Sequence, residues 1–468
     1  MDRWQIGRFP RRSDAVSVEP MKRLIVPLLL LLALFPARAM AQEEPEPFAA
    51  EVVRDGDAWR ATFHIPGKAP VWAFSRSALQ RISGTSWRPD SWTVLTPGVT
   101  LERIGRFDAL VAEGGAMPAT VEIAFTPLAV DLVADYDPAI ILSNGSLAIY
   151  TGHFGAFPVA SRAELEAMPG PGSYPERVSL RDEGGEVLHR GTRYRSATLS
   201  GGGYVIFGDV EVIESEHVAT ILDPGLPQWL ADGMGAFADE AFTFYTDRLG
   251  DHAESRPVIL ASWAGPTPEI ISLGGSVAGN MIGMRLEGAG LVDPVPQALE
   301  RAQWFVAHEG AHFWLGQTIG YRDRRDMWIT EGGADLLAMR LMERQELSEG
   351  SDMLALVDKA REDCAALLPN GGIWSADDRG DNRAYYACGM LFALAVDRAG
   401  AARGEDFFTF VTGLIAAQPE GKVGADEWLD AAADFGLSQE MLALMRVLLE
   451  EGSNDGQGAV ARLLGQNA

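Results

Sequence analysis

The chain has 468 residues, of which 47% are hydrophobic and 22% are charged, and its formal net charge is −26. This composition predicts a globular protein of two or three domains and excludes a disordered one. The negative charge makes nucleic acid and anionic membrane surfaces poor partners. It can serve solubility alone, although a field of this sign also favours cationic substrates.

The N-terminus carries the pattern of a secretory signal, at residues 21–41. A basic pair precedes an apolar run at residues 24–35, and Ala39-Met40-Ala41 supplies a small-x-small cleavage site. A membrane anchor is the alternative, but the run is short for a bilayer span and Pro36 interrupts it. We expect an exported protein, periplasmic or secreted, without stable membrane insertion. The basic segment before Met21 is an over-long leader, or Met21 is the true start.

Hydrophobic periodicity divides the rest of the chain. From about Phe48 to Thr220, short β-type runs such as "WRATFHI" alternate with turn residues, which predicts an antiparallel β domain. After "DPGLP" the period becomes mainly helical, "RPVILASW" indicates a buried strand, and the chain beyond Pro296 is nearly all helical. We predict an α+β multidomain protein with a leader and signal at 1–41, a β-rich domain at 42–225, an α+β domain at 226–402 and a helical C-terminal region at 403–468.

Two cysteines, Cys364 and Cys388, are too few for a disulfide framework. An exported chain can pair them, and a buried free thiol is the equal alternative for Cys388 in its apolar helical context. Neither has metal-ligand spacing, so histidine and carboxylate remain as ligand candidates.

The stretch "HEGAHFWLGQTIGYRDRRDMWITEGGAD", residues 308–335, has the spacing of a metal site. His308 and His312 are four residues apart on a helix expected at about 296–319, so both rings project from one face and can bind one ion. Glu309 faces the same cleft and can serve as a base. This is the HExxH element of zinc peptidases.

A third ligand follows in the first turn of a second expected helix. Glu331 comes after His312 with 18 intervening residues, and two histidines with one carboxylate are a standard set for one catalytic Zn²⁺ ion. Asp335, one turn further, can accept the free ring N–H of a ligand histidine. Alternatively, the histidines belong to the core and the helix dipole stabilises Glu331. That reading explains each residue singly but not their spacing.

These motifs resemble the gluzincin metallopeptidases, and within them the aminopeptidase N and leukotriene A hydrolase family. The family pattern is HExxHxWxG followed by a W-hydrophobic-x-E-G element, and this chain has "HEGAHFWLG" and "WITEG". The resemblance implies a thermolysin-like catalytic domain and one zinc ion on His308, His312 and Glu331. It also implies that Glu309 activates the metal-bound water. The further matching positions are Trp314, Gly316, Trp328 and Gly332.

The same resemblance directs attention to "NRAYYACGMLFALAVD". The family carries a Y-x-x-G element whose tyrosine stabilises the oxyanion, and Tyr386 with Gly389 matches it. Tyr385 is the alternative if the match to the family motif is displaced by one residue, and either ring can instead be a core aromatic.

One family element is incomplete. Aminopeptidases of the family use a G-x-M-E-N strand whose glutamate holds the substrate amine. The corresponding segment here is "GGSVAGN", in which Gly279 takes the place of that glutamate and Asn280 ends the motif. Gly279 and Asn280 are therefore the candidate substrate-binding residues, with Glu287 as a possible substitute carboxylate.

We expect a zinc-dependent peptidase, aminopeptidase-like, that acts on a peptide substrate. An endopeptidase or small-amide hydrolase of the same fold is one alternative, and the missing glutamate favours it. A non-catalytic zinc-containing binding protein is another, but a structural zinc site has no need of Glu309 as a base. The sequence indicates neither the preferred side chain nor the oligomeric state.

Overall fold

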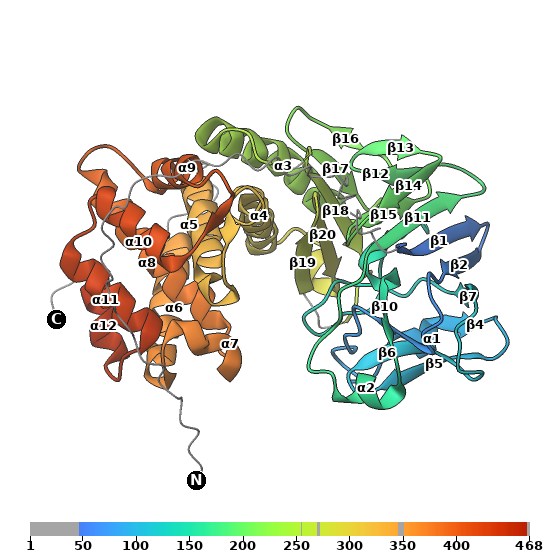
Figure 1. Cartoon of the computed structure of the whole chain (residues 1–468). Helices are drawn as coiled ribbons and strands as arrows, with labels where there is room; N and C mark the ends of the chain where they lie inside the picture. Colours follow the sequence, from blue (N-terminus) through green and yellow to red (C-terminus); the bar gives the residue numbers. More distant parts are fainter. Residues whose placement is uncertain (1–45, 254, 269–271, 345–350, 466–468) are drawn as a thin grey trace, which may run out of the picture. The chain divides into compact units, whose positions relative to one another are not determined.

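The computed structural model describes residues 46–253, 255–268, 272–344 and 351–465 (Figure 1). The expected signal at residues 21–41 lies outside these ranges. From Glu46 onward the chain forms one structural unit. Among the helices of the described residues, none is both long and apolar enough to cross a membrane.

Over residues 46–207 the chain forms three β-sheets and two short α-helices (Figure 1). Its strands are β1 (Phe48–Asp55), β2 (Ala58–His64), β3 (Val71–Phe74), β4 (Trp92–Val94), β5 (Val99–Ile104), β6 (Phe107–Ala112), β7 (Thr120–Phe125), β8 (Ala139–Ile141), β9 (Leu147–Tyr150), β10 (Ala156–Val159), β11 (Glu176–Asp182), β12 (Val187–His189), β13 (Thr192–Tyr194), β14 (Ser196–Leu199) and β15 (Tyr204–Phe207). The short helices are α1 (Arg88–Ser91) and α2 (Arg162–Ala167). The sheets have the orders β14-β11-β1-β2-β7-β4, β10-β3-β6-β5 and β13-β12-β15-β9-β8.

Alternating side chains build the core of these sheets. Phe48, Ala50 and Val52 on β1 are buried, and β2 contributes Ala61 and Phe63 to the same core. The period of two places these residues on one face of the sheet. The expected antiparallel pairing is confirmed with one exception, because β1 pairs with β11 in parallel.

A fourth sheet begins the second half, with the order β16-β17-β18-β20-β19. Its strands are β16 (Ile213–Glu214), β17 (Ala219–Leu222), β18 (Val258–Trp263), β19 (Ser272–Ala278) and β20 (Met281–Glu287). Strands β16 and β17 come before residue 226, where we expected the α+β domain to begin. That domain boundary stays a prediction. Strands β17, β18 and β20 run parallel, and β19 is an antiparallel edge strand. The predicted helix after "DPGLP" is α3 (Gln228–Leu249), which ends at Gly250 with φ +79°.

Helices make up most of the remaining chain (Figure 1). They are α4 (Pro296–Ala311), α5 (Trp328–Arg344), α6 (Ser351–Leu367), α7 (Ala376–Arg379), α8 (Arg383–Ala401), α9 (Phe407–Ala417), α10 (Ala425–Asp434), α11 (Gln439–Glu450) and α12 (Gly456–Leu463). Two short strands, β21 (Gly320–Tyr321) and β22 (Lys422–Val423), pair in parallel.

We expected helix α4 to extend to about residue 319, and this prediction is wrong. Helix α4 ends at Ala311, with His312 as its C-cap. Gly316 adopts φ +151°, and its N–H donates to the carbonyl of Ile319 at 2.9 Å. A residue in this conformation cannot continue a helix, so the segment turns back toward β21.

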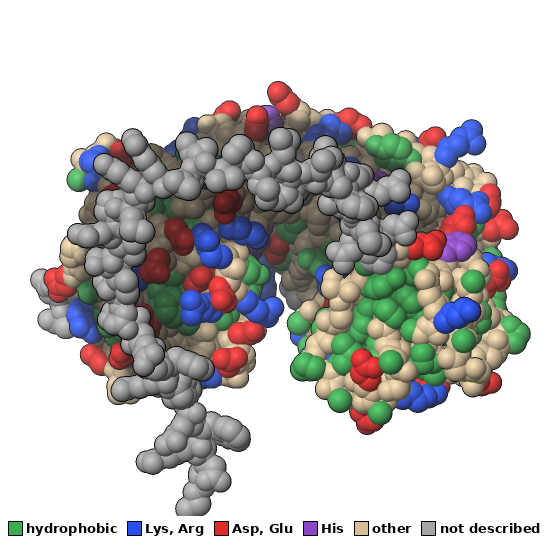
Figure 2. Space-filling view, in the orientation of Figure 1, with side chains coloured by type: hydrophobic (Ala, Val, Ile, Leu, Met, Phe, Trp, Pro, Cys, Tyr) green, Lys and Arg blue, Asp and Glu red, His purple; other side chains and the backbone are tan. Residues whose placement is uncertain are grey.

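Cys364 on α6 and Cys388 on α8 form a disulfide, which decides between the two alternatives left by the sequence. The bond joins two helices that also pack along each other. Over the helical half, acidic and basic side chains lie interspersed on the face shown in Figure 2. This distribution agrees with a role of the charge in solubility.

Candidate metal centre

Helices α4 and α5 bring three ligand atoms together. The end of α4 carries His308 and His312, and the first turn of α5 carries Glu331. The two Nε2 atoms are 3.3 Å apart, and the Glu331 Oε2 atom lies 3.6 Å from Nε2 of His308 and 3.4 Å from Nε2 of His312. The ligand atoms predicted from the sequence therefore form a nearly equilateral triangle.

The size of this triangle fits a zinc ion. Two ligands of a tetrahedral ion are separated by about 1.63 times the metal–ligand distance, and zinc binds imidazole nitrogen and carboxylate oxygen at about 2.0–2.2 Å. The separation expected between ligand atoms is therefore about 3.3–3.6 Å, close to the observed distances. His308, His312 and Glu331 can thus occupy three corners of a tetrahedron and leave the fourth open.

The outer nitrogen of each histidine faces an oxygen atom. Nδ1 of His308 lies 2.9 Å from Oδ1 of Asp335, and Nδ1 of His312 donates to the carbonyl of Leu315 at 2.9 Å. A proton on Nδ1 leaves the Nε2 lone pair of each ring directed at the centre, which is the tautomer that binds a metal. Two such lone pairs and a carboxylate facing one point repel one another unless a cation lies between them.

The electrostatics of the site point to the same requirement for a cation. Burial alone would lower the pKa of His308, but Asp335 and Glu331 raise it to about 10. Burial would raise the pKa of Glu331, yet His312 and His308 hold it well below its usual range. The three groups therefore favour a state in which positive charge sits among them. Glu309 differs from Glu331, because burial raises its pKa more than the two histidines lower it.

A close approach of α5 and α8 places Tyr386 over the site. A Cβ atom on Gly332 would collide with the backbone of Gly389, so only glycine allows this contact. The Tyr386 ring consequently lies nearly parallel to the His308 ring, with 6.1 Å between centroids. Burial and the neighbouring Glu331 carboxylate raise the pKa of the Tyr386 phenol, which stays protonated. Tyr385 is fully buried in the core, and its hydroxyl accepts a hydrogen bond from the backbone N–H of Asp377 at 3.3 Å.

The structure of an aminopeptidase N family protein from Idiomarina loihiensis superposes with a TM-score of 0.60 at 10% sequence identity, over 89% of this chain and 78% of that one. The chain has the fold of an aminopeptidase N family protein. An M1 zinc metallopeptidase from Deinococcus radiodurans matches with a TM-score of 0.47 at 13% identity, over 88% of this chain and 94% of that one. A mutant of the Deinococcus enzyme bound to a Tyr-Ser-Ala substrate matches with a TM-score of 0.45 at 13% identity, with the same coverage. Because the last two scores are below 0.5, the likeness of fold rests on the Idiomarina structure. The sequence matches neither a family model nor a curated protein.

Three motif residues of the aminopeptidase N resemblance stabilise the surroundings of the site. Trp314 is buried and donates its indole N–H to the carbonyl of Gly250 at 2.8 Å, which ties the segment after α4 to the end of α3. A Cβ atom on Gly316 would lie 2.9 Å from the carbonyl oxygen of His312, so the turn behind the second ligand requires glycine. Trp328 packs edge-on against Phe392 of α8.

Gly279 and Asn280 form the turn between β19 and β20. Gly279 has φ +59°, and its carbonyl accepts a hydrogen bond from Nε2 of the Gln317 side chain at 2.7 Å. The buried Asn280 side chain donates to the carbonyl of Arg256, which stabilises the turn. Glu287 lies at the far end of the hairpin, opposite Ser272. The turn therefore brings no carboxylate to the position of the family glutamate.

Two residues near the site were not predicted from the sequence. The Trp304 ring lies against His308, with 5.3 Å between centroids, and its position four residues earlier on α4 is a helical spacing that could have revealed it. Tyr136 donates its hydroxyl to the carbonyl of Val277 on β19 at 2.8 Å. A separation of 141 residues leaves no local signal for that contact.

Proposed function

We propose that this chain is a zinc-dependent peptidase, aminopeptidase-like, that hydrolyses peptide bonds. The observation that carries the proposal is the triangle of His308, His312 and Glu331 ligand atoms, which matches the spacing of three corners of a zinc tetrahedron. The aminopeptidase N fold and the adjacent Glu309 support it.

Glu309 is the proposed base. A zinc ion held by the three ligands would supply a Lewis acid that polarises a carbonyl and lowers the pKa of water. Burial raises the pKa of Glu309, so its carboxylate is a better proton acceptor than an exposed glutamate. Glu309 takes the proton of the attacking water and later passes it to the nitrogen of the leaving amine.

Tyr386 is the proposed oxyanion donor. Its raised pKa keeps the phenol protonated at neutral pH, as a hydrogen-bond donor must be. The hydroxyl donates to the carbonyl oxygen as negative charge develops on it, a contact that strengthens in the transition state. Loss of one such donor typically lowers the rate by about 10²–10³.

We also propose that the protein acts outside the cytoplasm. The signal pattern at residues 21–41 and the Cys364–Cys388 disulfide support this location, because disulfides persist in oxidising compartments.

The absence of a carboxylate at Gly279 favours a second candidate, an endopeptidase or small-amide hydrolase of the same fold. Such an enzyme would not need the free amine of its substrate. The two candidates share the metal centre and differ in the part of the peptide that they recognise.

Zinc content and hydrolysis of a peptide panel test the proposal, with the parent compared with Glu309→Gln. We expect one zinc ion in each protein and hydrolysis by the parent alone. Glu343→Gln on α5, which removes an exposed carboxylate paired with Arg340, is the matched control and should leave hydrolysis unchanged. A parent protein that holds zinc yet cleaves no peptide would refute the proposed function.

A further inference from the structure

Strand β19 is an edge strand of its sheet, and no other strand of the described residues pairs with its outer side. Its hairpin with β20 turns through two residues, and Ala278 and Met281 are the pair that closes the turn. Such a closing pair is hydrogen-bonded, and hydrogen-bonded and non-hydrogen-bonded pairs alternate along an antiparallel ladder. The N–H and C=O groups of Val277, Gly275 and Leu273 therefore point outward, away from β20.

This edge runs beside the helix that carries the metal ligands. A Cβ atom on Gly275 would lie 3.0 Å from the ring of Phe305, and Gln317 bonds the carbonyl of Gly279. Phe305 precedes His308 by one turn, and Gln317 follows the end of α4. Val277 lies between these two contacts, at the level of the metal ligands along α4.

Tyr136 occupies the outward edge at Val277. Its hydroxyl donates to the Val277 carbonyl at 2.8 Å, and its ring packs on Tyr150 with 4.6 Å between centroids. Burial raises the pKa of Tyr136, Arg76 opposes the rise, and the carboxylates of Asp135 and Glu309 add to it.

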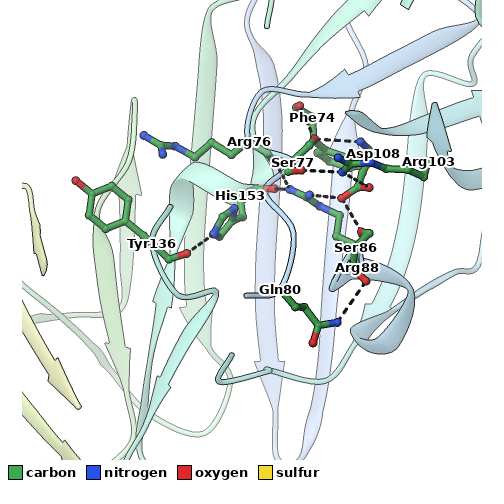
Figure 3. A network of polar contacts seen from close by, with 10 residues as sticks. All are labelled: Phe74, Arg76, Ser77, Gln80, Ser86, Arg88, Arg103, Asp108, Tyr136 and His153. Atoms are coloured by element: carbon green, nitrogen blue, oxygen red, sulfur yellow. Dashed lines mark hydrogen bonds and ion pairs between the residues drawn. The ribbon is translucent and has the colours of Figure 1, made fainter. Parts of the chain in front are cut away.

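A buried network fixes the backbone of Tyr136 in the β domain. The ring of the fully buried His153 is bonded through Nε2 to the carbonyl of Tyr136 at 2.8 Å, and Arg88 donates to the carbonyl of His153 at 2.8 Å. Arg88 in turn pairs with the buried Asp108. Figure 3 shows the Tyr136 side chain directed away from this network while its carbonyl faces His153.

The charged groups near Tyr136 favour the binding of a protonated amino terminus. Arg76 pairs with Asp135 at 2.6 Å beside the Tyr136 ring, and their charges cancel. The carboxylates at the metal centre, those of Glu309, Glu331 and Asp335, outnumber the two charges of one divalent ion. The remaining negative charge attracts a protonated amino terminus more than a carboxylate.

We propose that Tyr136 closes the edge of β19 at Val277, so that a bound peptide pairs only with Gly275 and Leu273 and its amino terminus stops at Tyr136. This inference rests on the proposed peptidase function and specifies it. Tyr136 is a specificity-determining residue that restricts the enzyme to the ends of peptides, although Gly279 supplies no amine-binding carboxylate. Its ring blocks the strand edge, and its hydroxyl removes the acceptor that a longer peptide would need.

The test compares a pentapeptide with its N-acetylated form, using the zinc-loaded full chain and mass spectrometry of the products. We expect the parent to release residues from the free amino terminus and to have at least about 100-fold lower kcat/KM on the acetylated peptide. Tyr136→Ala should reduce this preference at least about tenfold and yield internal cuts. Tyr136→Phe keeps the ring and frees the Val277 carbonyl, so it should reduce the preference about threefold.

Tyr174→Phe is the matched control, because the Tyr174 hydroxyl also donates to a backbone carbonyl, that of Glu46, in the same half of the chain. It should leave the preference unchanged. A parent that cleaves both peptides equally would overturn the closure by Tyr136 while preserving the peptidase function. A zinc-loaded parent that cleaves neither would overturn both. Unchanged preference in Tyr136→Phe and in a folded Tyr136→Ala would also overturn the closure.

Discussion

Gly332 on α5 and Gly389 on α8 pack backbone against backbone. A Cβ atom on Gly389 would lie 3.1 Å from the Cα atom of Gly332, and one on Gly332 would overlap the backbone of α8. Glu331 and Tyr386 stand beside these glycines, so the contact sets the position of both side chains relative to His308. The close contact of the two helices thus explains why both family motifs have glycine at these positions.

Gly332→Ala should therefore force α5 and α8 apart. We expect the free energy of unfolding to fall by about 1–3 kcal/mol from overpacking, together with weaker zinc binding. Thermal unfolding and zinc titration measure the two effects. Gly413→Ala is the control, because Gly413 is exposed on α9 with open space around it and alanine there should stabilise the helix by about 0.5–1 kcal/mol. Equal behaviour of the two variants would contradict the steric account.

Asp335→Asn tests how the first ligand is oriented. The substitution keeps the shape of the side chain but removes the charge that lies 2.9 Å from Nδ1 of His308. Partners of this kind typically contribute about 10–100-fold to metal affinity, and we expect a loss in that range in a chelator competition titration. The exposed Glu343→Gln on the same helix should leave the affinity unchanged. An unaltered affinity in Asp335→Asn would show that Leu315 and packing alone orient the rings.

His153 should make the protein sensitive to acid. Burial and the neighbouring Arg88 lower the pKa of His153 from its ordinary value of 6.5 to about 4. The unfolded chain therefore binds a proton that the folded chain does not between pH 6.5 and 4. The stabilisation is fully present above pH 6.5 and is lost as the pH falls through this window, by up to about 1.4 kcal/mol per pH unit.

Denaturant unfolding between pH 4 and 7 measures this dependence. His153→Gln retains a donor for the Tyr136 carbonyl but cannot titrate, so its slope against pH should be smaller than that of the parent. Replacement of the exposed His64 by Gln is the control and should leave the slope unchanged. The same slope in the parent and in His153→Gln would exclude His153 as the cause.

The Cys364–Cys388 disulfide should stabilise the helical half. It closes a loop with a sequence separation of 24, for which loop-closure entropy predicts a contribution of about 3.5 kcal/mol. Reductant should therefore lower the denaturant midpoint of the parent. The double variant Cys364→Ala with Cys388→Ala should show a reduced midpoint that reductant no longer changes. An identical midpoint of the parent with and without reductant would mean that the bond does not contribute to stability.

Local spacing was sufficient to predict that three candidate ligand side chains come together. His308 and His312 share one helical face because they are four residues apart, and Glu331 enters on the first turn of the next helix, as expected. The β-rich N-terminal half and the helix ending at Gly250 also follow from periodicity and glycine chemistry.

Other features depend on contacts between distant parts of the chain. The end of α4 at Ala311 is set by the turn at Gly316, whose conformation a helical periodicity does not reveal. The parallel pairing of β1 with β11 and the bond from Tyr136 to Val277 join segments more than a hundred residues apart. The free or paired state of the cysteines likewise depended on the packing of α6 on α8.

We propose that His308, His312 and Glu331 hold one zinc ion. Anomalous diffraction from a crystal of the zinc-loaded protein, recorded on both sides of the zinc absorption edge, tests it most directly. We expect one peak, present only above the edge, at about 2.0–2.2 Å from the two Nε2 atoms and the Glu331 carboxylate. A crystal of zinc-loaded protein with no peak among these atoms, or with its zinc bound elsewhere, would show that the three residues are not the zinc ligands.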